Sequence, residues 1–158
     1  MRIRPYSTGD LHDVVAMWHE SKRKAFPYVE VQQSYTIHDD ETHFRRVVAM
    51  ECEIWVAEVA DGIVGFVAMK GDLIDQLFVR VNAQRSGVGS ALLVRAKEVS
   101  PKALRAYTFR KNSPARNFFE KRGFVVVAEG VSAAPENEPD LEYVWAADGE
   151  PQAPVTAG

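Results

Sequence analysis

The chain has 158 residues, of which 46% are hydrophobic and 26% charged, and its formal net charge is −3. This size and composition indicate one globular domain with one core. The slightly acidic balance excludes a protein that binds nucleic acid through a basic face, and no apolar run approaches the ~20 residues that cross a bilayer. The N-terminus lacks the apolar segment of a signal peptide, and the single cysteine, Cys52, allows no internal disulfide. We therefore expect a cytoplasmic protein.

The first half of the chain changes from a helical to an alternating hydrophobic period near residue 50. Before this point the sequence predicts, in order, a strand over 3–6, a helix over about 8–24, a loop over 28–37 and a second helix that begins at 39 or 40. Ser7 and Asp10 have the spacing of a capping box at the start of the first helix. After it, the turns Asp61-Gly62 and Gly71-Asp72 separate three consecutive predicted strands, over 54–59, 63–69 and 73–79.

The second half alternates helices and strands. It predicts a helix over about 86–99, a strand over 104–109, a helix from Ser113-Pro114 to about residue 122, and strands over 124–128 and 141–145. Residues from about 148 predict a disordered tail, 148–158, after a single domain over 1–147. The hairpins and the strand–helix–strand unit together predict an α/β fold. Its sheet is mixed and mostly antiparallel, with six to seven strands and about four helices on both faces.

The segment from Gln84 to Gly89 joins a predicted strand to a predicted helix and carries glycines at 87 and 89. The first turn of a helix has unpaired N–H groups and a partial positive charge, and glycines allow a diphosphate to approach them closely. Arg85 adds a cation, and Arg80 is a candidate for a second. The alternative is a tight turn whose glycines serve packing. The segment lacks the third glycine of the dinucleotide fingerprint and the Gly-Lys-Ser/Thr of a Walker loop.

Two runs of sequence carry a more specific signal. IDQLFVRVNAQRSGVGSALL is a hydrophobic strand and short loop, followed by a Q-x-x-G-x-G segment that opens a helix, and NSPARNFFEKRGF follows it. Together they resemble the central motif and the second signature, N-x-x-A-x-x-F-Y-E-x-x-G-F, of the GNAT superfamily of N-acetyltransferases. The resemblance covers roughly residues 2–146 and is strongest over 73–124. It implies a GNAT-like fold and acetyl-CoA as the acyl donor, with no metal. The acceptor would be a primary amine of a small molecule or peptide, and the protein a monomer or homodimer with no nucleic-acid or membrane partner.

The resemblance also implies a site. The acyl-CoA would enter a gap beside the strand over 73–79, with the main chain of Leu77, Phe78 and Val79 along the pantetheine arm. The Leu77 N–H would donate to the thioester oxygen, which makes Leu77 a catalytic candidate. The pyrophosphate would be held by Gln84, Arg85, Ser86, Gly87, Val88, Gly89 and Ser90. Asn112 matches the motif asparagine that bonds to pantetheine or to neighbouring backbone; a plain turn residue is its alternative.

Direct attack of an amine on a thioester needs two proton transfers. Removing the proton of a lysine-like amine at pH 7 costs about 4.6 kcal/mol, so a base is required for such an acceptor. Asp75 is the candidate, acting through water from the strand face predicted to hold Leu73 and Leu77; a solvated strand residue is the alternative. The tyrosine that the family commonly uses as acid toward the CoA sulfur is Phe119 here. This departure leaves Tyr107 as a distant substitute, or else indicates a noncatalytic acyl-CoA-binding or regulatory module with Phe119 beside the coenzyme.

Overall fold

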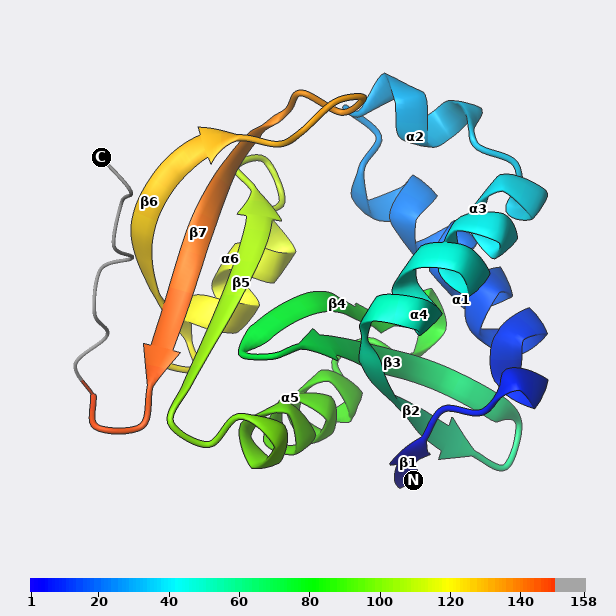
Figure 1. Cartoon of the computed structure of the whole chain (residues 1–158), viewed down its shortest axis with the longest axis horizontal. Helices are drawn as coiled ribbons and strands as arrows, with labels where there is room; N and C mark the ends of the chain where they lie inside the picture. Colours follow the sequence, from blue (N-terminus) through cyan, green and yellow to red (C-terminus); the bar gives the residue numbers. More distant parts are fainter. Residues whose placement is uncertain (150–158) are drawn as a thin grey trace.

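A seven-stranded sheet forms the centre of the protein, in a computed structural model that describes residues 1–149 (Figure 1). Its strands lie in the order β1-β2-β3-β4-β5-β7-β6. They are β1 (Arg2–Pro5), β2 (Glu53–Val59), β3 (Gly62–Lys70), β4 (Leu73–Val79), β5 (Ala103–Phe109), β6 (Val125–Val131) and β7 (Pro139–Ala146). β4 and β5 pair in parallel, and the other neighbours in this described sheet are antiparallel. The predicted α/β fold with a mixed, mostly antiparallel sheet is confirmed.

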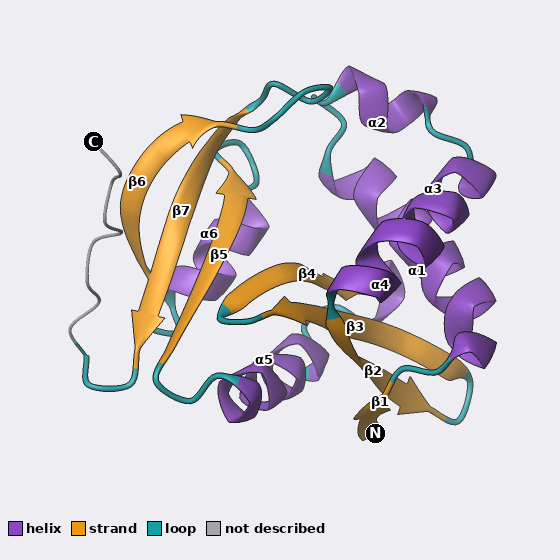
Figure 2. Ribbon diagram, in the orientation of Figure 1, coloured by secondary structure: helices purple, strands orange, loops and turns teal. Residues whose placement is uncertain are grey.

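Helices cover both faces of the sheet (Figure 2). They are α1 (Leu11–Ala25), α2 (Glu30–Ser34), α3 (Ile37–His43), α4 (Ala49–Glu51), α5 (Val88–Val99) and α6 (Ser113–Glu120). Three shorter segments join them: the 3-10 turns η1 (Thr8–Asp10) and η3 (Val81–Ala83), and the π-helical turn η2 (Phe44–Val48). Trp18 of α1 packs with Phe44 and with Phe66 of β3 on one face, and Leu92 of α5 packs with Val67 of β3 on the other. β3 is therefore buried on both sides and anchors the two clusters.

Two helical segments differ from the sequence prediction. Residues 28–37, predicted to be a loop, contain α2 and reach the start of α3. The second helix begins at Ile37 rather than at residue 39 or 40, because the Thr36 hydroxyl accepts a hydrogen bond from the Asp39 N–H at 3.1 Å. This helix does not continue regularly, since the π turn η2 follows α3 and the Ala49 N–H bonds to the Phe44 carbonyl.

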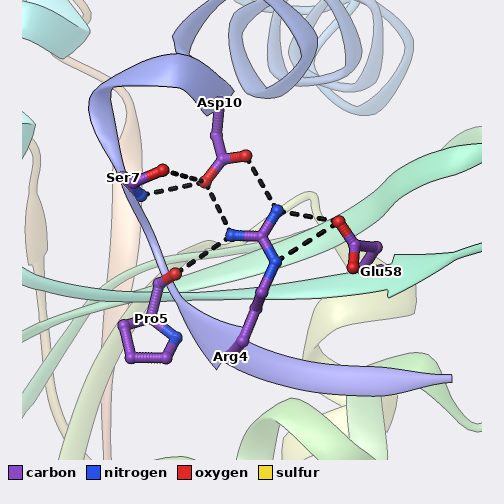
Figure 3. A network of polar contacts seen from close by, with 5 residues as sticks. All are labelled: Arg4, Pro5, Ser7, Asp10 and Glu58. Carbon is purple, nitrogen blue, oxygen red and sulfur yellow. Dashed lines mark hydrogen bonds and ion pairs between the residues drawn. The ribbon is translucent and has the colours of Figure 1, made fainter.

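The start of α1 is fixed to the sheet by Arg4 (Figure 3). Its guanidinium donates to both carboxylate oxygens of Asp10, each at 2.8 Å, and to Glu58 of β2 at 2.8 Å. Asp10 in turn accepts from the Ser7 N–H at 2.9 Å, so the predicted pairing of Ser7 and Asp10 is confirmed. The hydrogen bonds from Arg4 hold the pKa of the Asp10 carboxyl below its usual range. The network joins β1, β2 and the first turn before α1, which sets the position of α1 over the sheet.

Two further predictions concern the C-terminal tail and the lack of a membrane-spanning segment. From residue 150 on, the predicted disordered tail lies outside the described residues, and the domain boundary at residue 147 stays a prediction. Within residues 1–149, none of the helices combines the length and the apolar character that crossing a bilayer requires.

Candidate active site

β4 and β5 separate almost as soon as they meet. Their parallel ladder consists of two pairs, Leu73 with Arg105 and Ile74 with Ala106. Beyond these pairs the strands diverge (Figure 2), so the second half of β4 faces a gap on that side within the described sheet. This half contains Leu77, Phe78 and Val79, the residues expected to run along a pantetheine arm. Main-chain groups that face such a gap can pair with an extended ligand as another strand would.

The gap opens into a cleft of about 800 Å³. Its floor consists of residues 74–78 of β4 and 106–109 of β5, and its walls come from α1, α2, α3, α6 and the loop between β6 and β7. Aromatic side chains line it, and five carboxylates do so as well: Asp39, Asp40, Asp75, Glu136 and Asp140. The cleft therefore combines apolar walls with a negative charge that favours a cationic ligand.

Asp75 occupies a β-bulge, which the sequence pattern did not reveal. Met69 of β3 faces Ile74 and Ala68 faces Gln76, so Asp75 has no partner across the ladder. A bulge re-aims the side chains that follow it. Ile74 and Leu77 both pack toward α5 and α6, whereas Gln76 accepts a hydrogen bond from Trp18 of α1 at 3.2 Å.

The predicted alternation of Leu73, Asp75 and Leu77 on one face is therefore wrong. The exposed Asp75 carboxylate instead accepts a hydrogen bond from the Gln76 amide at 3.3 Å. It still lines the cleft, so its role as the base is compatible with its position and stays a prediction.

The loop before α5 has the backbone of an anion-binding turn. Gly87 is the N-cap of α5 at φ 86°, and Arg85 is also left-handed, at φ 65°. Ser86 donates its hydroxyl to the Ala83 carbonyl, which closes the turn. Successive N–H groups in such a turn point into one concavity, beside the positive end of the helix. Gly87 thus provides the required conformation, whereas a Cβ on Gly89 would stand 3.0 Å from the Phe118 ring, so Gly89 serves helix packing.

Two arginines lie near this loop, one considered from the sequence and one not. Arg80, expected to add a cation, donates its guanidinium to the Ile63 carbonyl at the β2–β3 hairpin. Arg122, not considered, donates to the Ser90 hydroxyl at 2.7 Å and to the Phe118 carbonyl at 2.9 Å. Its guanidinium also lies 3.9 Å above the Phe118 ring. Arg122 therefore brings a positive charge to the first turn of α5.

Asn112 and Phe119 lie at opposite ends of α6, and both border the cleft. The Asn112 side chain accepts from the Ala115 N–H at 3.3 Å and caps α6. Its side-chain carbonyl oxygen is thus engaged as a helix cap, which agrees with the alternative that Asn112 is a turn residue. Its side-chain amide N–H groups remain as candidate donors to pantetheine. Phe119 is 5% exposed; its ring stacks on Tyr143 and contacts the Phe124 ring at a tilt. Phe119 offers no polar atom to a departing thiolate.

Tyr107, the substitute acid considered from the sequence, lies on the other side of β5 from Ala106. Its hydroxyl donates to Glu142 of β7 at 3.0 Å. Burial, together with this hydrogen bond, raises the pKa of Tyr107 above its ordinary value. A phenol with a raised pKa is a poorer proton donor, so the raised pKa argues against Tyr107 as the acid.

A buried ionic network at the cleft was missed altogether. Lys22 of α1 lies 2.8 Å from Asp40 of α3, and the other Asp40 oxygen lies 2.7 Å from Nδ1 of His19. The Lys22 ammonium also sits 3.5 Å above the Trp18 ring. The available signal was a lysine four residues after Trp18, on the apolar face of α1. Its partner Asp40 is distant in sequence, so the pair could not be inferred from spacing.

Comparisons with known proteins agree with this geometry. Residues 50–126 match the family model described as an acetyltransferase (GNAT) domain. Probable N-acetyltransferase Rv2775 of Mycobacterium tuberculosis is 30% identical over 138 residues, which cover 78% of this chain and 79% of that protein. The chain belongs to the GNAT family. Peptidyl-lysine N-acetyltransferase YiaC of Escherichia coli is 29% identical to this GNAT protein over 126 residues, covering 79% of this chain and 84% of YiaC.

Solved structures share the GNAT fold. The PaiA N-acetyltransferase of Thermoplasma acidophilum, solved in complex with coenzyme A, has a TM-score of 0.68 at 20% identity, and the match covers 89% of this chain and 96% of that one. As a GNAT acyltransferase, the protein transfers an acetyl group from acetyl-CoA to an amine, and the noncatalytic alternative is not favoured. Among residues 1–149, no three His, Cys, Asp or Glu side chains are grouped so that they could hold a metal ion.

Proposed function

We propose that this enzyme acetylates a lysine-type amine, carried by a peptide or a small molecule, which is cationic at neutral pH. The observation that carries the proposal is the set of carboxylates along the cleft, Asp39, Asp40, Asp75, Glu136 and Asp140. These carboxylates attract an ammonium group. In the described part of the chain, Lys22 forms a direct ion pair with Asp40 and with none of the other four. The aromatic walls suit the aliphatic stem of such an acceptor. The name of YiaC, a peptidyl-lysine N-acetyltransferase, supports the same class.

The donor is proposed to lie along the unpaired half of β4. The main chain of Leu77, Phe78 and Val79 pairs with the pantetheine arm, and the Leu77 N–H donates to the thioester oxygen. The turn of residues 84–90 holds the pyrophosphate through its amides. The Asn112 side-chain amide donates to pantetheine while its carbonyl oxygen caps α6. The left-handed Arg85 and Gly87 support this placement, since they turn consecutive N–H groups toward one point.

Asp75 is proposed as the base that accepts the proton of the acceptor ammonium through water. Its carboxylate is exposed, borders the cleft, and lies one residue beyond the last β4–β5 pair. The neutral amine then attacks the thioester carbon and its nitrogen bonds to that carbon. The nitrogen gives its excess proton to water as the carbon–sulfur bond breaks, and Asp75 returns its own proton to solvent. The Leu77 N–H stabilises the oxyanion that forms in between.

Thiol release from acetyl-CoA tests the acceptor class. The panel contains a lysine peptide, the same peptide with arginine in place of lysine, a small alkylamine, and an uncharged aromatic amine. We expect kcat/KM for the lysine peptide or the alkylamine to exceed that for the aromatic amine by about tenfold or more, and no turnover of the arginine peptide. Preference for the uncharged amine would overturn the acceptor class. Failure of the protein to bind CoA in calorimetry would overturn the placement of the donor.

A further inference from the structure

Thr108 carries a buried hydroxyl at the cleft that the steps above do not use. The residue lies on β5 and is 6% exposed, and its Oγ1 has no hydrogen-bond partner in the described part of the chain. A buried hydroxyl that lacks a partner costs roughly 1–3 kcal/mol, a cost that valine at the same place would avoid. Thr108 also borders the cleft. A hydroxyl in this position therefore points to a partner that arrives with the substrates.

Thr108 lies across the gap from the N–H group proposed to bind the thioester oxygen. The strands run parallel, and their last pair is Ile74 with Ala106, so Thr108 stands opposite the Gln76–Leu77 segment. Thr108 alternates with Ala106, which belongs to the cluster beneath α5 and α6. Leu77 packs against the same cluster. Thr108 and Leu77 thus share the face of the sheet on either side of the proposed thioester position.

This face lacks the phenol that the related motif would supply. Phe119 belongs to the same cluster and borders the cleft, but its ring has no donor. Tyr107 neighbours Thr108 in sequence, yet its side chain is on the opposite face, where it donates to Glu142. Thr108 therefore places a hydroxyl on the face where Phe119 places none.

We propose that the Thr108 hydroxyl donates a hydrogen bond to the CoA sulfur as the carbon–sulfur bond breaks. The electron pair of that bond moves to sulfur, and the hydrogen bond stabilises the developing thiolate. Threonine keeps its proton throughout, and the released thiolate takes a proton from water. The proposal rests on the placement of the thioester beside Leu77 given under the proposed function.

The test is a titration of the bound CoA thiol, followed by thiolate absorbance while the pH is raised. A hydrogen bond worth about 1.4 kcal/mol to the thiolate corresponds to a tenfold change in its protonation equilibrium. In Thr108→Val the thiol of bound CoA should titrate about one pH unit higher than in the wild type. Thr108→Ser should titrate like the wild type. In turnover assays, Thr108→Val should lower kcat about tenfold, with KM for acetyl-CoA changed less than twofold.

Two controls separate this role from a structural one. Desulfo-CoA lacks the sulfur, so Thr108→Val should bind it as tightly as the wild type does. Thr8→Val, which changes an exposed threonine in η1, should leave the thiol titration unchanged. An unchanged titration in Thr108→Val, or an equal loss of affinity for CoA and desulfo-CoA, would overturn the proposal. A wild-type protein that binds desulfo-CoA but does not shift the thiol titration would overturn it while leaving the proposed function intact.

Discussion

The ammonium of Lys22 and the carboxylate of Asp40 form a buried ion pair that joins α1 to α3 at the cleft. Nζ lies 2.8 Å from Oδ1, and the two side chains are 8% and 5% exposed. Burial lowers the pKa of Lys22, and the bond with Asp40 opposes that shift. The pair fixes one wall of the cleft relative to the other elements, so its energetics bear on the shape of the acceptor site.

Replacing Asp40 by asparagine should destabilise the protein by about 3 kcal/mol, because it leaves a buried ammonium without its counter-charge. Chemical denaturation at pH 7 measures this loss. The folded state holds the Lys22 proton less tightly than the unfolded chain, so the Lys22 contribution makes stability rise as the pH approaches the ordinary lysine value. In Asp40→Asn this rise should begin at a lower pH. Glu41→Gln removes an exposed pair with Arg45 and should cost less than about 0.5 kcal/mol; an equal loss in both variants would contradict this account.

Asp75→Asn should reduce kcat/KM for a lysine-type acceptor by about a hundredfold or more, since general base catalysis contributes roughly 10²- to 10⁴-fold. It should also flatten the acid side of the pH–rate profile. Because the side chain is exposed on a bulge, the thermal unfolding temperature should change little. Asp61→Asn, in the exposed turn between β2 and β3, is the matched control. A pH profile that is identical in Asp75→Asn and the wild type removes Asp75 as the base.

Phe119→Tyr should turn over at an equal or higher rate, because a phenol on α6 would restore a donor toward the departing sulfur. Phe119 is 5% exposed and packs between Phe124 and Tyr143, so the new hydroxyl must point toward the cleft to avoid burial without a partner. Steady-state kinetics measure the gain from the new donor, and thermal denaturation measures any loss of stability from burying the new hydroxyl. A large loss of activity in a stably folded variant would show that position 119 faces away from the sulfur and that its alignment with the family tyrosine is wrong.

Arg122→Gln should weaken CoA binding about tenfold in calorimetry. The guanidinium stands at the positive end of α5, and both of its hydrogen-bond partners are neutral oxygens, so an anion at that turn would offset its charge. Pantetheine, which lacks the diphosphate, shows whether Arg122 acts on that group: its binding should not change in Arg122→Gln. Arg95→Gln is the control, because Arg95 also stacks on an aromatic ring but lies further along α5, beside Trp55. Equal weakening of CoA and pantetheine would assign Arg122 a structural role.

The parts of the fold that could be read from the sequence are those set by local chemistry. The turn pair Asp61-Gly62 and the helix start at Ser113-Pro114 act within a few residues. The turn stands where it was expected, and the helix begins one residue earlier than expected, because Asn112 rather than Ser113 is its N-cap. The turn before α5 was found from its local glycine spacing, and the structure adds that Gly87 has a left-handed backbone, which favours glycine. The five-residue α2 was missed because a segment that short shows no hydrophobic period.

The parts of the site that could not be read depend on contacts between distant segments. The bulge at Asp75 exists only through its pairing with β3, and one extra residue there reverses the predicted face. Lys22 and Asp40 meet because α3 folds onto α1. Thr108 reads as an ordinary strand residue until the separation of β4 and β5 places it at the cleft.

The two-pair ladder between Leu73–Ile74 and Arg105–Ala106 has a consequence for the lifetime of the protein. An acyl donor that fills the gap supplies backbone bonds to β4, so donor binding stabilises the folded state by a free energy that grows with the logarithm of the donor concentration above its dissociation constant. We therefore expect the amount of this enzyme that survives proteolysis to follow the supply of acetyl-CoA, with starvation for the coenzyme removing the catalyst together with its substrate.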